Sequence, residues 1–100
     1  MYGRLRLERW KTLSKELKVA VTIKKMLSDD RIPYFSSIHS ILSDEMSPST
    51  LHTILDRLVD LGTVHADWAK ADDGKKWVRE FKIKGESEAF IDKIISELYD

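Results

Sequence analysis

The sequence predicts an α+β domain in which three helices are followed by a two-stranded hairpin and a last helix. Three observations support this fold class. Apolar residues recur at helical spacing in four segments, which is typical of amphipathic helices. One segment starts with serine and proline, which favour a helix N-terminus. An Asp-Gly turn lies between two runs of β-forming residues. Residues 1–100 contain no linker or repeat and fit one domain.

The chain begins with an extension over residues 1–15, and the first long helix is expected to start near Leu13. From there the apolar residues follow the helical period, at Leu13, Leu17, Ala20, Val21, Ile23, Met26 and Leu27. Residues 28–31 are polar, and Pro33 follows them. These residues end the helix, because proline lacks a backbone N–H and disfavours helix in the residue before it.

A short second helix is expected next, with Ser36 or Ser37 as its N-cap. Its apolar stripe is formed by Ile38, Ile41 and Leu42, and it ends near residues 44–46. Because Ile41 and Leu42 lie three and four positions after Ile38, these apolar residues predict one buried face and one exposed face for this helix.

The third helix has the clearest start signal in the chain. Ser47 is a good N-cap, and Pro48 stands at the first helical position, where its missing N–H costs nothing. Gly62 is expected to end the helix in a left-handed conformation. Its apolar stripe is Leu51, Ile54, Leu55, Leu58 and Leu61.

Residues 63–84 predict a β-hairpin, and residues 86–99 predict the last helix. The first strand alternates apolar and polar side chains, and the turn contains Asp73-Gly74, a strong hairpin signal. On the second strand Trp77, Phe81 and Ile83 fall on one face, with Arg79 between them. Residues 34–62 therefore read as a helix-turn-helix and the hairpin as its wing, which makes the predicted fold a winged helix-turn-helix.

The segment from residue 47 to residue 64 resembles the third helix and first wing strand of PadR-like regulators. It has their Ser-Pro-x-Thr-Leu start, their Leu-x-x-Leu stripe, and their Leu-Gly end followed by valine or isoleucine. Trp68, Gly74 and residues 79–83 resemble the wing of that family, so the resemblance spans residues 34–84. MarR-like and other archaeal and bacterial winged helices share the pattern. The resemblance implies a homodimeric transcription regulator that binds double-stranded DNA.

The third helix and the wing carry the residues expected to contact DNA. An α-helix fits the major groove, about 12 Å wide, so side chains near its N-terminus reach base edges. From the helix these are Ser47, Ser49, Thr50, His52, Thr53 and Arg57, and from the wing they are Lys70, Lys75, Lys76 and Arg79. Two alternatives stay open: Arg57 pairs with Asp56 or Asp60 instead, and the wing lysines only protect a solvated strand edge.

A dimer interface is expected on the last helix, together with Trp10 of the extension. The residues are Trp10, Phe90, Ile91, Ile94, Ile95 and Leu98. The same apolar stripe fits packing against the first helix, and the two uses are compatible. A two-fold dimer matches half-sites about 10–10.5 base pairs apart or multiples of that spacing.

Charge does not decide the function class. Net charge is zero, but residues 1–27 carry +6 and residues 70–84 carry +3, while residues 28–69 carry −5 and residues 85–100 carry −4. Two basic blocks fit a polarised DNA-binding molecule. The zero total and the acidic residues Asp56 and Asp60 fit the alternative, a winged-helix protein–protein interaction module.

The chain has none of the motifs that carry catalysis or cofactor binding. It lacks cysteine, and His39, His52 and His65 are spaced too widely for a metal site on one helix or turn. It also lacks a Gly-rich phosphate loop and the H-E-x-x-H and G-x-S-x-G motifs. We therefore expect a non-enzyme without cofactor or metal. The lack of cysteine and of a long apolar run predicts a cytoplasmic protein with no membrane partner.

Overall fold

The structure, a computed structural model, describes residues 4–71 and 73–99. Within them the elements follow in the order α1 (Leu7–Thr12), α2 (Lys15–Ser28), α3 (Phe35–Leu42), α4 (Pro48–Asp60), β1 (Val64–Lys70), β2 (Trp77–Ile83) and α5 (Gly85–Leu98). The α+β class is therefore confirmed. The described residues hold one helix more than expected, because α1 lies in the segment taken as an extension.

The boundary between α1 and α2 differs from the sequence-based expectation. The long helix does not start near Leu13, because Leu13 has extended backbone angles (φ −70°, ψ 144°) and ends α1. Ser14 caps α2 instead, and its hydroxyl accepts a hydrogen bond from the Leu17 amide at 3.2 Å. The cap satisfies one of the amides that a helix start leaves without a partner.

The expected N-cap of α3 is wrong. Tyr34, not Ser36 or Ser37, takes the cap position. Ser37 stands at the third helical position. Its buried hydroxyl accepts from the Tyr34 amide at 2.9 Å and donates to the Ile32 carbonyl at 2.9 Å. Ile41, expected in the apolar stripe, is 45% exposed.

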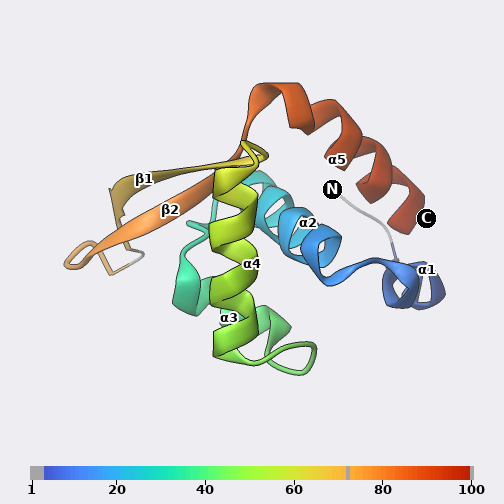
Figure 1. Cartoon of the computed structure of the whole chain (residues 1–100), viewed down its shortest axis with the longest axis horizontal. Helices are drawn as coiled ribbons and strands as arrows, with labels where there is room; N and C mark the ends of the chain where they lie inside the picture. The colour runs from blue at the N-terminus through green and yellow to red at the C-terminus, as the bar shows by residue number, and fades with distance from the viewer. Residues whose placement is uncertain (1–3, 72, 100) are drawn as a thin grey trace.

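Helix α2 lies at the centre of the fold and contacts α3, α4, α5 and β2 (Figure 1). Its residues Val19 and Ile23 are fully buried. Helices α3, α4 and α5 and the two strands add further side chains to this core. They include Ile38, Leu42, Leu51, Leu55, Leu58, Val64, Phe81, Ile83, Ile91, Ile95 and Leu98. Burial of these apolar side chains is the main force that holds the helices together.

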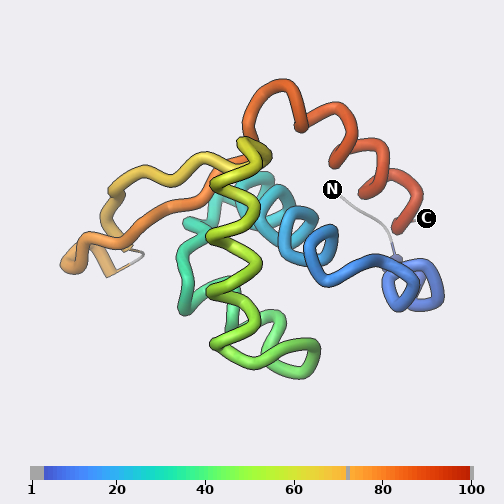
Figure 2. The backbone as a smooth tube through the Cα atoms, viewed as in Figure 1, coloured from blue at the N-terminus to red at the C-terminus, as the bar shows by residue number. Residues whose placement is uncertain are grey.

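The hairpin is fixed at its base and projects from the body (Figure 2). Strands β1 and β2 are antiparallel, in a register that runs from Val64 opposite Ile83 to Lys70 opposite Trp77. Gly62 leads from α4 into β1 with a φ of +78°, a conformation that glycine adopts without strain. On its other side, β2 is joined to the chain before α3, because the Phe81 amide donates to the Pro33 carbonyl at 2.8 Å.

The two ends of the described chain meet at the side of the molecule opposite the hairpin (Figure 1). The Arg6 amide donates to the Leu98 carbonyl at 2.6 Å, and Leu5 forms an isolated bridge with Tyr99. This contact places α1 against α5. None of the helices in the described residues has the length and apolar character needed to span a membrane.

Candidate nucleic-acid interface

Helix α4 begins as the sequence predicts. The Ser47 hydroxyl accepts from the Thr50 amide at 3.2 Å and donates to the Thr50 hydroxyl at 3.0 Å, and Pro48 stands at the first helical position. The four buried positions of the helix are Leu51, Ile54, Leu55 and Leu58. The side chains of Ser47 and Thr50 are therefore engaged with each other at the helix start. Side chains of the following turns are not engaged in this contact.

The opposite side of α4 is uncovered. Its exposed side chains include Ser49, His52, Thr53, Asp56 and Arg57, and the acidic Asp60 near the helix end is exposed as well. Nδ1 of His52 lies 3.8 Å from a carboxylate oxygen of Asp56, and the Thr53 hydroxyl donates to the Ser49 carbonyl at 3.2 Å. Within residues 4–71 and 73–99 no carboxylate pairs with Arg57, so the alternative pairing with Asp56 or Asp60 is not formed.

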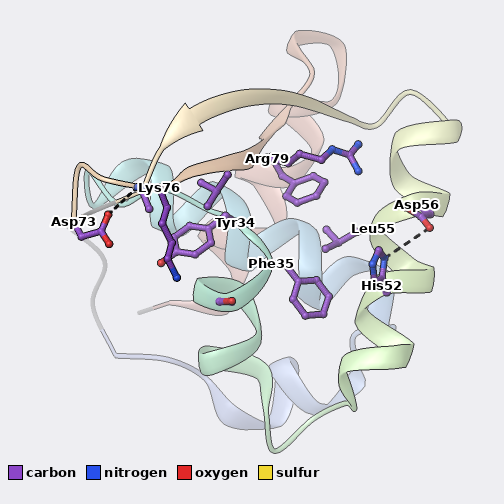
Figure 3. A pocket seen from close by; sticks show the side chains of 12 residues that line it. Tyr34, Phe35, His52, Leu55, Asp56, Asp73, Lys76 and Arg79 are labelled. Atoms are coloured by element: carbon purple, nitrogen blue, oxygen red, sulfur yellow. Dashed lines mark hydrogen bonds and ion pairs between the residues drawn. The ribbon is translucent and has the colours of Figure 1, made fainter.

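An open pocket of about 580 Å³ lies between this side of α4, the start of α3 and the hairpin (Figure 3). Tyr34 and Phe35 line it from the α3 side, His52 and Asp56 from α4, and Lys76 and Arg79 from the hairpin; Ser36, Leu55, Ala71, Asp73, Val78 and Phe81 complete the lining. The fold thus brings three of the predicted DNA contacts, from α4 and the hairpin, to one cavity.

The charges around this pocket are mixed. Arg79 holds its guanidinium carbon 5.5 Å from the centre of the Phe81 ring, a favourable cation–π geometry. At the hairpin turn, Asp73 accepts hydrogen bonds from the backbone amides of Lys75 at 2.8 Å and Lys76 at 3.4 Å. These two bonds lower the pKa of Asp73. Its carboxylate is therefore charged at neutral pH and partly offsets the two lysines.

Two groups of aromatic residues near the site were not recognised from the sequence as part of it. The Phe35 ring is stacked on the His39 ring, with 6.2 Å between the ring centres, and is tilted against the His52 ring, with 5.2 Å between the centres. The four-residue spacing of Phe35 and His39 on a helix signals the first contact, but nothing local signals the second. Trp68 and Trp77 on the hairpin are 69% and 63% exposed, although alternation assigned Trp77 to the same face as buried side chains.

The residues expected at a dimer interface fall into two groups. Ile91, Ile95 and Leu98 are each 1% exposed, because they pack into the core of their own protomer. Their side chains are therefore used inside the protomer, and Ile94 is also partly buried. Phe90 is 59% exposed and is free of the core.

Trp10, the remaining residue expected at that interface, takes part in a polar contact inside the protomer. Its indole N–H donates to Oε2 of Glu45 at 3.2 Å, and Lys18 donates to Oε1 of the same carboxylate at 2.7 Å. The Lys18 ammonium also lies 5.5 Å from the Trp10 ring centre. These bonds, the one from Lys18 above all, lower the pKa of Glu45.

Among the described residues no three histidine or acidic side chains converge as they would around a metal ion. Comparisons of this chain with protein-family models, with curated proteins and with solved structures find no match. The function is therefore inferred from the geometry of α4, the pocket and the hairpin.

Proposed function

We propose that the chain is a winged helix-turn-helix transcription regulator that binds double-stranded DNA at specific sequences. The observation that carries the proposal is the uncovered side of α4, which borders a pocket also lined by basic residues of the hairpin. In this proposal α3 and α4 form the helix-turn-helix, and the hairpin of β1 and β2 is the wing. The resemblance of residues 34–84 to PadR-like regulators supports the same function.

Side chains on the first two turns of α4 would read the bases. A helix inserted in the major groove presents its N-terminal residues to base edges. His52 and Thr53 are exposed there, and His52 is 68% exposed at its side chain. An imidazole can hydrogen-bond guanine, and a hydroxyl can bond either a base or a phosphate. We therefore assign sequence preference to His52 and Thr53, and a phosphate contact to Arg57.

The wing would hold the DNA backbone. Lys75 and Lys76 are exposed at its turn, and Arg79 projects beside the pocket (Figure 3). Contacts from lysine and arginine to phosphates position a protein on a duplex without regard to sequence. Asp73, whose charged carboxylate accepts from the backbone amides of these lysines, opposes deep insertion of the turn.

The proposal includes a homodimer on a two-fold DNA site. Because most of the apolar side of α5 is buried in its own protomer, contact between copies would use the exposed Phe90 and its surroundings. A closed dimer of this kind requires half-sites about 10–10.5 base pairs apart, or a multiple of that distance.

Selection of bound sites from random duplexes tests the proposal most directly. We expect wild type to return a two-fold site and His52→Ala or Thr53→Ala to return a changed one. Lys75→Ala and Lys76→Ala should weaken binding to all sequences alike, and each lost phosphate contact should reduce the salt slope of log affinity by about 0.9. Lys15→Ala is the matched control, because Lys15 is an exposed lysine at the start of α2. The same selected site for wild type and for both α4 variants would refute the assignment of α4 as the reading helix.

A second candidate is a winged helix used to bind another protein, as part of a transcription, replication or viral assembly. The exposed apolar side chains favour it, since Leu61 is 70% and Phe90 59% exposed and the net charge is zero. Exposed apolar patches often mark interaction sites. Failure to bind random or genomic duplex at ~50 mM salt would favour this candidate, because non-specific binding is electrostatic and strongest at low salt.

A further inference from the structure

The outer part of the hairpin has two unlike faces. In the antiparallel register Trp68 is opposite Arg79, and Lys70 is opposite Trp77. Opposite residues, and residues two apart on a strand, project from the same side of a sheet. These four side chains therefore share one side, which we call the tryptophan face. Near the base of the hairpin the same side carries buried Phe81.

The tryptophan face is open to solvent. Trp68 and Trp77 are 69% and 63% exposed. Lys70 lies 5.6 Å from the centre of the Trp77 ring, and Arg79 lies over Phe81. In the part of the chain that the structure describes, neither cation pairs with an acidic side chain. Both contacts are to aromatic rings, which leaves the positive charge available to an anion.

The other face of the hairpin shows that this arrangement is not general. Asp67 and Glu80 face each other there across the strands, and each has a partner beside it on its own strand. His65 lies 2.9 Å from Asp67, and Lys82 lies 3.8 Å from Glu80. The two strands thus place Asp67 and Glu80 on one side, with His65 and Lys82 beside them. They place two indoles and the cations Lys70 and Arg79 on the other.

We propose that the tryptophan face binds unpaired nucleotides of a single-stranded nucleic acid. A polynucleotide carries a flat ring and a negative charge in every repeat, which matches indoles interleaved with cations. Bases stack on exposed aromatic side chains in a way that tolerates any sequence, while nearby cations hold the phosphates. Paired bases inside a duplex have both ring faces covered by their neighbours, so the indoles require unpaired ones. The proposal does not depend on α4 reading a duplex.

Lys75 and Lys76 extend the positive charge beyond the tryptophan face. Both are exposed in the turn between β1 and β2. A strand stacked on Trp77 reaches this turn next, since Trp77 is the first residue of β2. We therefore expect Arg79 and Lys70 to contact phosphates beside the stacked bases, and the turn lysines to add contacts at the end of the strand.

The test is binding of a short oligothymidylate, which does not pair with itself, followed by tryptophan fluorescence and by anisotropy of a labelled strand. We expect binding with quenched fluorescence. Trp68→Leu and Trp77→Leu should each weaken affinity about 5- to 150-fold, because one stacked base is lost. Trp77→Phe should retain most of the affinity, because phenylalanine also stacks. Arg79→Gln should lower the salt slope of log affinity by about 0.7.

Two controls make the result specific. Leu7→Ala removes an exposed apolar side chain on α1, where Leu7 is 53% exposed, and should leave the affinity unchanged. Trp10 lies on α1, at the opposite end of the molecule, so the double variant Trp68→Leu/Trp77→Leu should keep Trp10 emission but show no quenching. Circular dichroism of each variant verifies the fold.

Several results would overturn the proposal. They are absence of binding to both oligothymidylate and oligouridylate at ~50 mM salt, equal affinity of wild type and the two leucine variants, or an equal loss in Leu7→Ala. Binding of either strand with the expected losses supports it. Loss of duplex binding in the His52 and Thr53 variants leaves this result unchanged, so the two proposals fail independently.

Discussion

Replacing Glu45 by glutamine tests how α1 is attached to the rest of the fold. Glu45 lies in the turn between α3 and α4, where its carboxylate accepts from Trp10 of α1 at 3.2 Å and from Lys18 of α2 at 2.7 Å. The side chain of Lys18 is 11% exposed and that of Glu45 is 32% exposed. The variant keeps an oxygen acceptor but leaves the nearly buried ammonium without its counter-charge.

The expected loss follows from the exposure of the pair. A hydrogen bond to a charged group contributes about 1.5–3 kcal/mol, and solvent reduces this for a partly exposed pair. We expect Glu45→Gln to lower the free energy of unfolding by about 1–2 kcal/mol. At this chain length each kcal/mol lowers Tm by about 4–8 °C. Lys18→Met removes the unpaired cation, so the double variant should lose less than the two single losses together.

The pH dependence has a definite sign. Because the hydrogen bonds from Lys18 and Trp10 lower the pKa of Glu45 in the folded state, the contact stabilises fully above the unfolded pKa of about 4.3. Its contribution is lost as pH falls through the lower folded pKa. Thermal unfolding followed by circular dichroism should show the largest gap between wild type and Glu45→Gln near neutral pH. A gap that is absent at pH 7, or strictly additive single and double variants, would refute this account of α1.

Four further substitutions test the helices. Ser47→Ala removes the cap on the Thr50 amide and should cost about 1 kcal/mol in chemical denaturation; an unchanged midpoint would show that the cap is not needed. Gly62→Ala places a side chain at a φ of +78° and should cost about 1–2 kcal/mol, whereas no loss would mean that the turn relaxes. Ile91→Ala should cost about 2–5 kcal/mol in unfolding of the protomer, and Phe90→Ala little, because Phe90 is 59% exposed; an Ile91 variant that keeps its stability but loses the dimer in sedimentation would instead place that residue between copies.

Local signals account for the elements that the sequence predicts well. For α4, the serine cap, the proline and the glycine all indicate the same boundaries, and the helix spans Pro48–Asp60 within the expected residues 47–62. The hairpin was equally clear, because alternation and an Asp-Gly turn agree over the same residues. The start of α3 was predicted wrongly, because the Ser37 hydroxyl donates to the Ile32 carbonyl instead of capping the helix. This bond depends on the position of the segment before α3, which the bond from the Phe81 amide to the Pro33 carbonyl fixes against β2.

Contacts between distant residues explain what the sequence does not predict. Helix α1 has six residues, too few to be stable alone, and its Trp10 finds Glu45 far along the chain. The meeting of His52 and Arg79 at one pocket likewise depends on the angle between α4 and the hairpin. The sequence predicted which side chains of α4 are exposed. The exposure of Trp68 was not predictable in the same way, because it depends on how far the hairpin extends beyond the core.

The bond from the Phe81 amide to the Pro33 carbonyl makes the two outer borders of the hairpin unequal. Proline has no N–H to return, so the chain beside β2 accepts once and cannot continue a regular ladder with a further strand. Backbone groups along the free border of β1 remain open to pairing with another molecule, and the charged Asp67 and Lys70 there discourage it. Strand addition along β2 is therefore interrupted at Phe81, whereas among the described residues no such bond to a neighbouring segment interrupts the border of β1.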